Sequence, residues 1–218
     1  MPVFALVVSL PVLISSFYSG KVTVHRSLDI LIVLLALVIL SPVLVIIFFT
    51  VKLSSDGGGI FQQSRVGRHG KEFAMYKFRT MYRANGNEAN SFSAGDTTRV
   101  TSVGRILRRS KMDELPQLFN VLLGDMAIVG PRPEVRRWVD EYPALWEKIH
   151  TLRPGITDPA SIEYRNEEEL LIKATNPEKM YRDEVLPKKL ALYTQYTQER
   201  SFLGDVTIII KTLIAVFR

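Results

Sequence analysis

A long apolar segment near the start of the chain constrains its fold more than any other feature. Within residues 30–51, only Ser41, Pro42 and Thr50 are not apolar. A helix needs about 20 predominantly apolar residues to cross the hydrocarbon core of a bilayer. We therefore predict that this segment forms a helix in a membrane, and that the rest of the chain is organised against it.

The proline near the middle of this segment leaves two topologies open. Pro42 removes one helical hydrogen bond and clashes with the preceding turn, so a kink is expected, and the Ser41 hydroxyl can donate to a carbonyl one turn earlier. Basic residues lie on both sides, with Arg26 before the segment and Lys52 after it. Because basic flanks favour the cytoplasmic side, they suit a re-entrant helix whose two ends return to one face. The residues alone still favour an ordinary kinked transmembrane helix.

Composition limits the chemistry of the remaining chain. The 218 residues suffice for one domain, and the formal net charge of +6 favours anionic partners such as phosphorylated substrates, anionic lipids or nucleic acid. The absence of cysteine excludes disulfides and thiolate catalysis. Three histidines without paired spacing argue against a zinc site.

The chain divides into three parts. Residues 1–25 form a marginal hydrophobic N-terminal segment, which lacks the basic start of a signal peptide because no Lys or Arg precedes Lys21. Residues 26–55 form the membrane helix. Residues 56–218 form a small domain, which begins with a glycine-rich linker at Asp56.

The expected fold of that domain is α+β and mostly helical. Two short strands, 60–65 and 73–78, should form a β-hairpin around a turn. Gly67 and Gly70 in this turn lack the Gly-Lys-Ser/Thr ending of a phosphate-binding loop. The polar residues 83–98 predict a loop. Helices are predicted over 134–151, over 177–200 with a kink allowed at Pro187, and over 204–217, where the helix lies on the membrane or packs on the core.

Two adjacent carboxylates, Asp113 and Glu114, occupy an unusual position. Asp113 is placed to cap a short helix, with Glu114 in its first turn, and a positive helix end beside cations should keep both ionised. A turn spelled GPRP (130–133) follows the helix. The cations precede the pair: Arg99, Arg105, Arg108, Arg109 and Lys111. The expected buried face of the helix contains four residues: Leu115, Leu118, Phe119 and Leu122.

This arrangement suits chemistry on a polyphosphate. Cations can hold the phosphates while one carboxylate attacks or binds and the other holds a divalent metal ion. A surface helix with a cap and salt bridges is the alternative, and on spacing alone it is the commoner explanation of an Asp-Glu pair.

Several ordered motifs resemble one family. The stretch DELPQLFNVLLGDMAIVGPRP (113–133) is similar to the core signature of the bacterial sugar transferases, the small monotopic phosphoglycosyl transferases. The similarity continues in YKFRTM (76–81), GRILRRS (104–110) and LRPGIT (152–157), and it covers roughly residue 26 to the C-terminus. Several motifs in order make a more specific signal than one short pattern.

The resemblance implies a function. Such an enzyme transfers a phosphosugar from a UDP-sugar to undecaprenyl phosphate and releases UMP, at the first membrane step of a glycan pathway. Asp113 would be the nucleophile that forms a phosphosugar-aspartyl intermediate, and Glu114 would bind Mg²⁺. Four residues would bind phosphate: Arg132, Arg108, Arg165 and Lys77.

The resemblance also implies a location. A helix broken at Ser41-Pro42 would be re-entrant in the bacterial inner membrane, with the catalytic domain on the cytoplasmic face of the bilayer. A homodimer is left open.

The chain departs from the family pattern after LRPGIT. The family commonly continues with Gly, an apolar residue and Ala-Gln, and later with Gly-Arg-Asn, whereas this chain has DPAS (158–161) and YRN (164–166). Donor recognition is expected to differ here, so no particular sugar is assigned.

A second kind of function remains to be weighed. A non-catalytic membrane-bound basic adaptor that binds anionic lipid or nucleic acid would fit the net charge. The chain has no RNA-binding aromatic signature, so no nucleic acid partner is expected. The adaptor also leaves Asp113 and Glu114 without a role.

Overall fold

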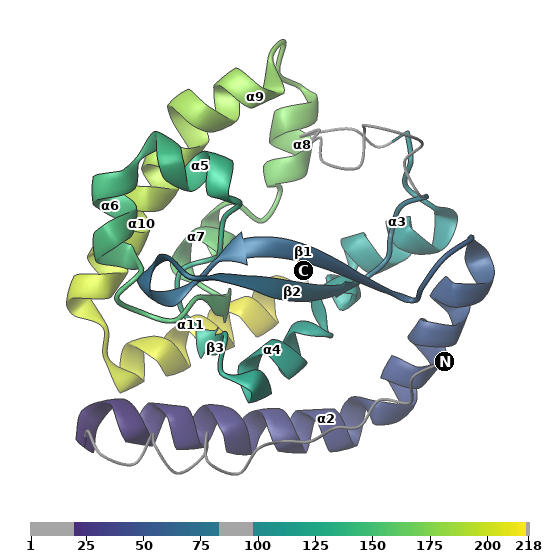
Figure 1. The fold of residues 1–218 in the computed structure, drawn as a ribbon, viewed down its shortest axis with the longest axis horizontal. Helices are drawn as coiled ribbons and strands as arrows, with labels where there is room; N and C mark the ends of the chain where they lie inside the picture. Colours follow the sequence, from purple (N-terminus) through teal and green to yellow (C-terminus); the bar gives the residue numbers. More distant parts are fainter. Residues whose placement is uncertain (1–19, 83–97, 217–218) are drawn as a thin grey trace.

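The computed structural model describes residues 20–82 and 98–216 (Figure 1). The α-helices are α2 (Gly20–Ser54), α3 (Ser102–Arg109), α4 (Gln117–Leu123), α5 (Arg136–Glu141), α6 (Pro143–Ile149), α7 (Pro159–Glu163), α8 (Glu167–Ile172), α9 (Pro177–Met180), α10 (Leu186–Glu199) and α11 (Phe202–Val216). The strands are β1 (Ile60–Val66), β2 (Glu72–Phe78), β3 (Ala127–Val129) and β4 (Gly155–Thr157). Short turns of helix are η2 (Arg68–Gly70), η4 (Met112–Glu114) and η5 (Tyr181–Val185). The predictions for residues 1–19 and for the loop at 83–97 lie outside the described residues.

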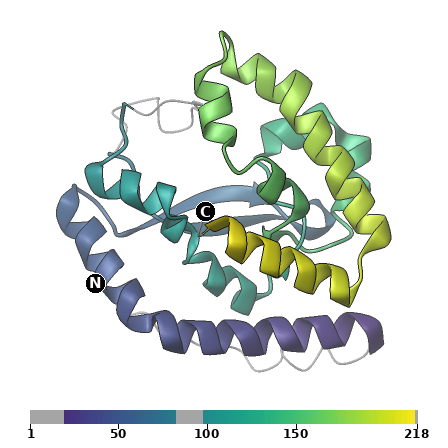
Figure 2. The same ribbon diagram turned by 180° about the vertical axis from the view of Figure 1, so that it is seen from behind.

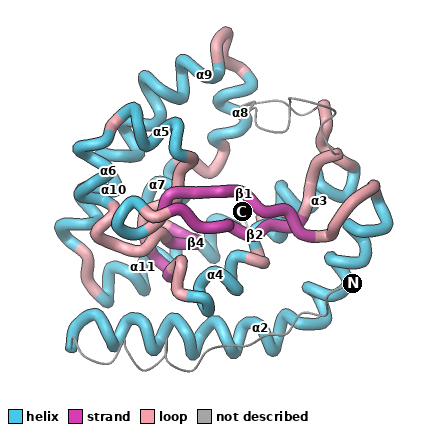
Figure 3. The backbone as a smooth tube through the Cα atoms, viewed as in Figure 1, coloured by secondary structure: helices cyan, strands magenta, loops and turns pink. Residues whose placement is uncertain are grey.

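The α+β, mostly helical class is confirmed, and so is the hairpin (Figure 3). Strands β1 and β2 pair antiparallel, from Ile60 opposite Phe78 to Val66 opposite Glu72. The sequence did not predict the second sheet, in which β3 pairs parallel with β4. Each of those strands has three residues, which is too short for an alternating pattern to be recognised.

Helix α2 is long and apolar enough to cross a membrane, by length and composition alone. It contains Pro42 and bends along its length, as Figure 1 shows. The Ser41 hydroxyl donates to the carbonyl oxygen of Val38 at 2.8 Å, which confirms the predicted bond to the preceding turn. Val38 and Ile39 are each 74% exposed. This surface of the helix is therefore apolar, and the other described residues leave it exposed.

Hydrogen bonds join both ends of α2 to the rest of the chain. The Arg26 guanidinium donates to the carbonyl oxygens of Val121 and Met126, at and just beyond the end of α4. At the other end, Arg79 donates to the carbonyl oxygens of Val51 (3.3 Å) and Ser55 (2.7 Å). Both arginines donate to backbone carbonyl groups at or just beyond a helix end, and through these hydrogen bonds they join α2 to the domain.

The largest buried cluster lies among α5, α6, η5 and α10, and its largest side chains are Trp138, Trp146, Tyr181 and Tyr193. Helix α11 lies on the side seen in Figure 2 and packs against α7, β3 and β4. Of the two predicted placements, on the membrane or on the core, the structure shows packing on the core. Leu203 and Leu213 of this helix nevertheless remain exposed.

The single helix predicted over 134–151 is wrong. Two helices, α5 and α6, occupy this region and meet at Tyr142. Pro143 disfavours helical geometry in the residue before it, so the helix breaks there. The helix predicted over 177–200 is confirmed, and its irregular part is the π-helical turn Tyr181–Val185 just before Pro187.

Candidate active site

Asp113 and Glu114 lie in η4, a short 3-10 turn between α3 and α4. The prediction that Asp113 caps α4 is wrong, because α4 begins at Gln117 after Pro116 and has no side-chain cap. Lys111, with φ 58°, adopts the left-handed conformation and turns the chain out of α3. Such a conformation in a residue other than glycine costs free energy and often occurs at functional sites.

Helix α3 is held closely against the segment that follows β2. The Thr101 hydroxyl caps it by accepting from the Gly104 amide at 2.8 Å. A Cβ atom on Gly104 would lie 2.1 Å from the Thr80 carbonyl oxygen, so only glycine permits this approach. The motifs GRILRRS and YKFRTM therefore meet in space, which places Arg108 beside Thr80, with Nε donating to Oγ1 at 3.2 Å.

The predicted buried face of α4 is only partly correct. The buried residues of the helix are Gln117, Asn120 and Val121, while Phe119 is 42% exposed. Asn120 explains the difference. Its side chain accepts from the Tyr76 amide at 2.9 Å and donates to the Ala74 carbonyl at 2.7 Å. It thus acts as a strand partner for β2 and fixes the carboxylates relative to that strand.

Glu114 lies between two cations that come from distant parts of the sequence. Lys77 on β2 donates to Oε1 at 2.8 Å, and Arg132 donates to both carboxylate oxygens, one of them at 3.1 Å. Arg132 thus makes a bidentate contact with the carboxylate, for which its planar guanidinium is suited. The ion-pair partners of Glu114 are therefore not the basic residues that directly precede it in the sequence.

The charges around Glu114 decide its ionisation. Burial alone would raise the pKa of Glu114, but Arg132 and Lys77 outweigh it and hold that pKa well below its usual range. The same ion pair raises the pKa of Arg132 well above its usual value. Glu114 is therefore ionised at neutral pH, as predicted.

Asp113 differs from its neighbour. It is 7% exposed, and its Oδ1 atom has no hydrogen-bond partner within residues 20–82 and 98–216. Burial, followed by the negative charge of Glu114, raises the pKa of Asp113, which Lys77, Lys111 and Arg108 only partly oppose. The cations were expected to keep both carboxylates ionised, and they oppose the shift at Asp113 without reversing it, so the two neighbouring carboxylates have pKa shifts of opposite sign. A buried carboxylate with an unpartnered oxygen is a poorly solvated, reactive base.

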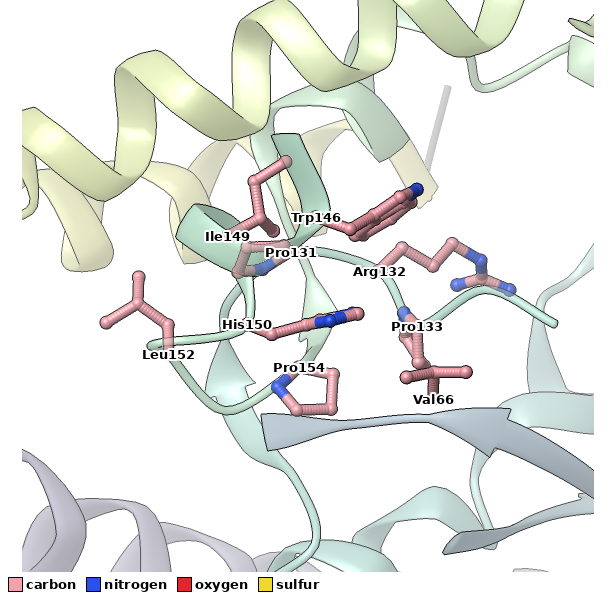
Figure 4. Close-up of a pocket in the computed structure, with 9 residues that line it drawn as sticks. All are labelled: Val66, Pro131, Arg132, Pro133, Trp146, Ile149, His150, Leu152 and Pro154. Carbon is pink, nitrogen blue, oxygen red and sulfur yellow. The ribbon is translucent and has the colours of Figure 1, made fainter. Parts of the chain in front are cut away.

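Arg132 is presented by a stiff turn. A Cβ atom on Gly130 would lie 2.4 Å from the Arg153 carbonyl oxygen, because the turn crosses close to the start of β4. Figure 4 shows Pro131 and Pro133 packed near the stacked rings of Trp146 and His150, whose centroids are 5.0 Å apart, while the guanidinium of Arg132 extends to the edge of this group. The backbone that carries Arg132 is therefore fixed before any substrate arrives.

The remaining predicted phosphate ligands lie further out. Arg108 forms an ion pair with Glu168 of α8, with NH1 and Oε1 2.8 Å apart. Arg165 lies in the turn between α7 and α8 and is half-buried. The Arg165 side chain makes no hydrogen bond or ion pair within the described residues. The structure thus joins Lys77 and Arg132 directly to Glu114, but it does not join Arg108 or Arg165 to either carboxylate.

Three charged residues near the site were not identified from the sequence: Arg65, Glu134 and Lys189. Arg65 of β1 donates to Glu134 at 3.1 Å, and Glu134 lies 3.6 Å from the ammonium group of Lys189. Glu134 is 5% exposed and Lys189 is 3% exposed. Glu134 directly follows the GPRP turn, and this position is the one signal that could have indicated its role. The pairing itself depends on strands and helices that are distant in sequence.

The two carboxylates fit a common way in which proteins bind magnesium. Mg²⁺ is commonly held by one or two carboxylates together with substrate phosphates and water. Within the described residues, no group of three His, Cys, Asp or Glu side chains could form a complete cage for a metal ion. Asp113 Oδ1, which has no hydrogen-bond partner among the described residues, and the Glu114 carboxylate, which accepts from Lys77 and Arg132, are oxygen donors of the required type.

Comparison with known proteins identifies the family of this chain. A family model described as bacterial sugar transferase matches residues 20–218. UDP-N-acetylgalactosamine-undecaprenyl-phosphate N-acetylgalactosaminephosphotransferase of Aeromonas hydrophila is 39% identical over 64% of this chain and 34% of its own length. UDP-glucose:undecaprenyl-phosphate glucose-1-phosphate transferase of Escherichia coli K12 is 38% identical over 86% of this chain and 39% of its own length.

A relative of similar size is the exopolysaccharide production protein ExoY of Sinorhizobium fredii. It is 36% identical over 88% of this chain and 84% of its own length. The chain thus spans little more than a third of the first two relatives and most of the third. Since the family model covers nearly the whole chain and a relative of similar size aligns over most of both proteins, this chain belongs to the bacterial sugar transferase family.

Proposed function

We propose that this protein transfers a phosphosugar from a UDP-sugar to undecaprenyl phosphate and releases UMP, through a covalent intermediate on Asp113. The observation that carries the proposal is the pair of unlike carboxylates. Asp113 is buried with one oxygen that has no hydrogen-bond partner in the described part of the chain, while Glu114 beside it is held ionised between Lys77 and Arg132. The names of several relatives describe sugar-phosphate transfer to undecaprenyl phosphate.

In the first step, a carboxylate oxygen of Asp113 attacks the sugar-bearing β-phosphorus of the donor. The bond from that phosphorus to the bridging oxygen breaks, and UMP leaves with the electron pair. No proton has to be removed from the nucleophile, because the attacking group is already an anion. In the structure, Lys77 and Arg132 neutralise Glu114. The negatively charged diphosphate of a bound donor can interact with the same two cations.

In the second step, an oxygen of the lipid phosphate attacks the phosphorus of the phosphosugar-aspartyl intermediate. The acyl phosphate bond breaks and the Asp113 carboxylate is regenerated, so the product is a lipid-linked sugar diphosphate. Glu114 is the residue that would hold Mg²⁺ during both steps. The ion, when bound, reduces the electrostatic repulsion between the attacking carboxylate and the phosphoryl group.

Release of UMP from a panel of UDP-sugars, in the presence of Mg²⁺ and undecaprenyl phosphate, tests this function. We expect UMP and lipid-linked sugar in equal amounts with at least one donor. Binding to anionic vesicles without turnover of any donor would instead support the non-catalytic adaptor.

The same function places the protein at the cytoplasmic face of the inner membrane, where a nucleotide sugar and a lipid phosphate can meet. The contacts of α2 favour the re-entrant form. Arg26, near one end, and Val51, near the other, both contact the domain. A helix that crossed the bilayer with the domain on one side would carry one of these ends away from it.

Thiol labelling tests this topology in a chain that has no native cysteine. Ser27 and Lys52 are exposed near the two ends of α2. We expect Ser27→Cys and Lys52→Cys to react with a membrane-impermeant reagent only after the cytoplasmic face is opened. Arg26 itself is unsuitable for labelling, because it is buried against α4.

The Ser41-Pro42 pair within α2 supplies a second test. Replacing it with Ala-Leu removes the proline from the apolar helix and should move part of the population into a spanning form. Labelling of Ser27→Cys from outside intact cells, with Lys52→Cys protected, would show that the native helix already spans the membrane.

A further inference from the structure

A buried cation links the two segments that carry Arg132 and Arg165. Lys189 of α10 is 3% exposed, and its Nζ atom lies 3.0 Å from Glu167 Oε2 and 3.6 Å from Glu134 Oε1. It also donates to the Tyr181 hydroxyl at 3.3 Å. A buried ammonium group that loses a partner is strongly destabilising. The two carboxylates are therefore held in place around one fixed charge.

One side of this cation is the turn that presents Arg132. Glu134 directly follows Pro133 and accepts hydrogen bonds from Arg65 and from the Tyr181 hydroxyl. Arg65 also donates to the Pro133 carbonyl at 3.2 Å. The exit of the turn is thereby attached to β1, η5 and α10 at once.

The other side is the connection that carries Arg165. Glu167 begins α8, two residues after Arg165. At the far end of the connection, the fully buried Asp158 caps α7 by accepting from the Ser161 amide at 2.8 Å. The segment with Arg165 is thus held by Asp158 at its start and by Lys189 at its end. This segment is also where the chain departs from the family pattern.

We propose that Lys189 is a positioning residue, which holds Arg132 and Arg165 at a fixed separation so that both can bind one UDP-sugar donor. The inference rests on the proposed function. Lys189 is buried and makes its contacts through Glu134 and Glu167, so it acts without touching the donor. Arranging two binding arginines beforehand lowers the entropy that binding would otherwise lose.

Glu167→Gln tests the link with little risk to the fold. It removes the negative charge from the Lys189–Glu167 ion pair, while Lys189 keeps Glu134, and the Glu167 side chain is 28% exposed. We expect the donor KM to rise about tenfold with kcat changed by less than about threefold. Lys188→Met, which removes an exposed neighbouring charge, is the control and should leave both constants unchanged.

A double-mutant cycle separates positioning from a general structural effect. In an Arg165→Ala background, Glu167→Gln should change the donor KM by less than about twofold, because the arginine to be positioned is gone. An equal rise in KM in both backgrounds, or no rise in either, would overturn the inference while leaving the proposed function intact. Absence of turnover by the wild-type protein would end both.

Discussion

Replacing Asp113 with asparagine is expected to abolish turnover. The variant loses the nucleophile but keeps the shape of the side chain, and removal of an enzyme nucleophile typically lowers kcat by more than about 10⁴-fold. UMP release is the measurement. Asp140→Asn, which makes the same change at an exposed position in α5, is the matched control and should keep full activity.

The Asp113→Asn variant should lose activity without losing thermal stability. Because burial and Glu114 raise the pKa of Asp113, the folded protein disfavours the charged form. A neutral side chain should therefore leave the melting temperature unchanged or raise it, as is common when a functional group is removed from a strained site. Incubation of the wild-type protein with donor alone should give a phosphosugar adduct on Asp113 by mass spectrometry. An adduct on another residue would refute the assignment.

The raised pKa of Asp113 also sets the acid limit of the reaction. Only the carboxylate form attacks, and a raised pKa means that protonation begins at a higher pH than for an ordinary aspartate. As pH falls, kcat/KM should therefore decline earlier than an unperturbed aspartate would cause. Glu114 does not contribute in this range, since its own pKa is held well below the usual value.

Glu114→Gln should produce the second largest loss. Removal of the carboxylate takes away the proposed Mg²⁺ ligand and leaves Lys77 and Arg132 without their counter-charge. We expect kcat/KM to fall about 100-fold or more and the Mg²⁺ concentration at half-maximal rate to rise. The free energy of unfolding should fall by about 1–3 kcal/mol, because two largely buried cations lose a hydrogen-bonding partner.

The measurements are a Mg²⁺ titration of UMP release and a thermal unfolding curve. Glu147→Gln, at an exposed position in α6, is the control for loss of one carboxylate and should affect neither. Undiminished turnover of the wild-type protein in excess EDTA would refute metal dependence. A stable but fully active Glu114→Gln variant would remove this residue from the site.

The sequence by itself determined the features that depend on neighbouring residues. The apolar length of α2, the proline near its centre and the Ser41 bond to Val38 are local properties of one segment. The hairpin follows from two short strands around a turn. The Asp113–Glu114 pair and the GPRP turn are likewise contiguous motifs, so their presence and their order could be recognised without a structure.

Tertiary structure decided which charges face one another. Glu114 pairs with Lys77, 37 residues before it, and with Arg132, 18 residues after it, rather than with the basic run beside it. Asn120, which lies outside the face expected to be apolar, is buried because it completes the hydrogen bonding of β2. Packing also gave the two neighbouring carboxylates opposite pKa shifts. Ionisation depends on burial and on the distance to each charge, and only the folded chain fixes both quantities.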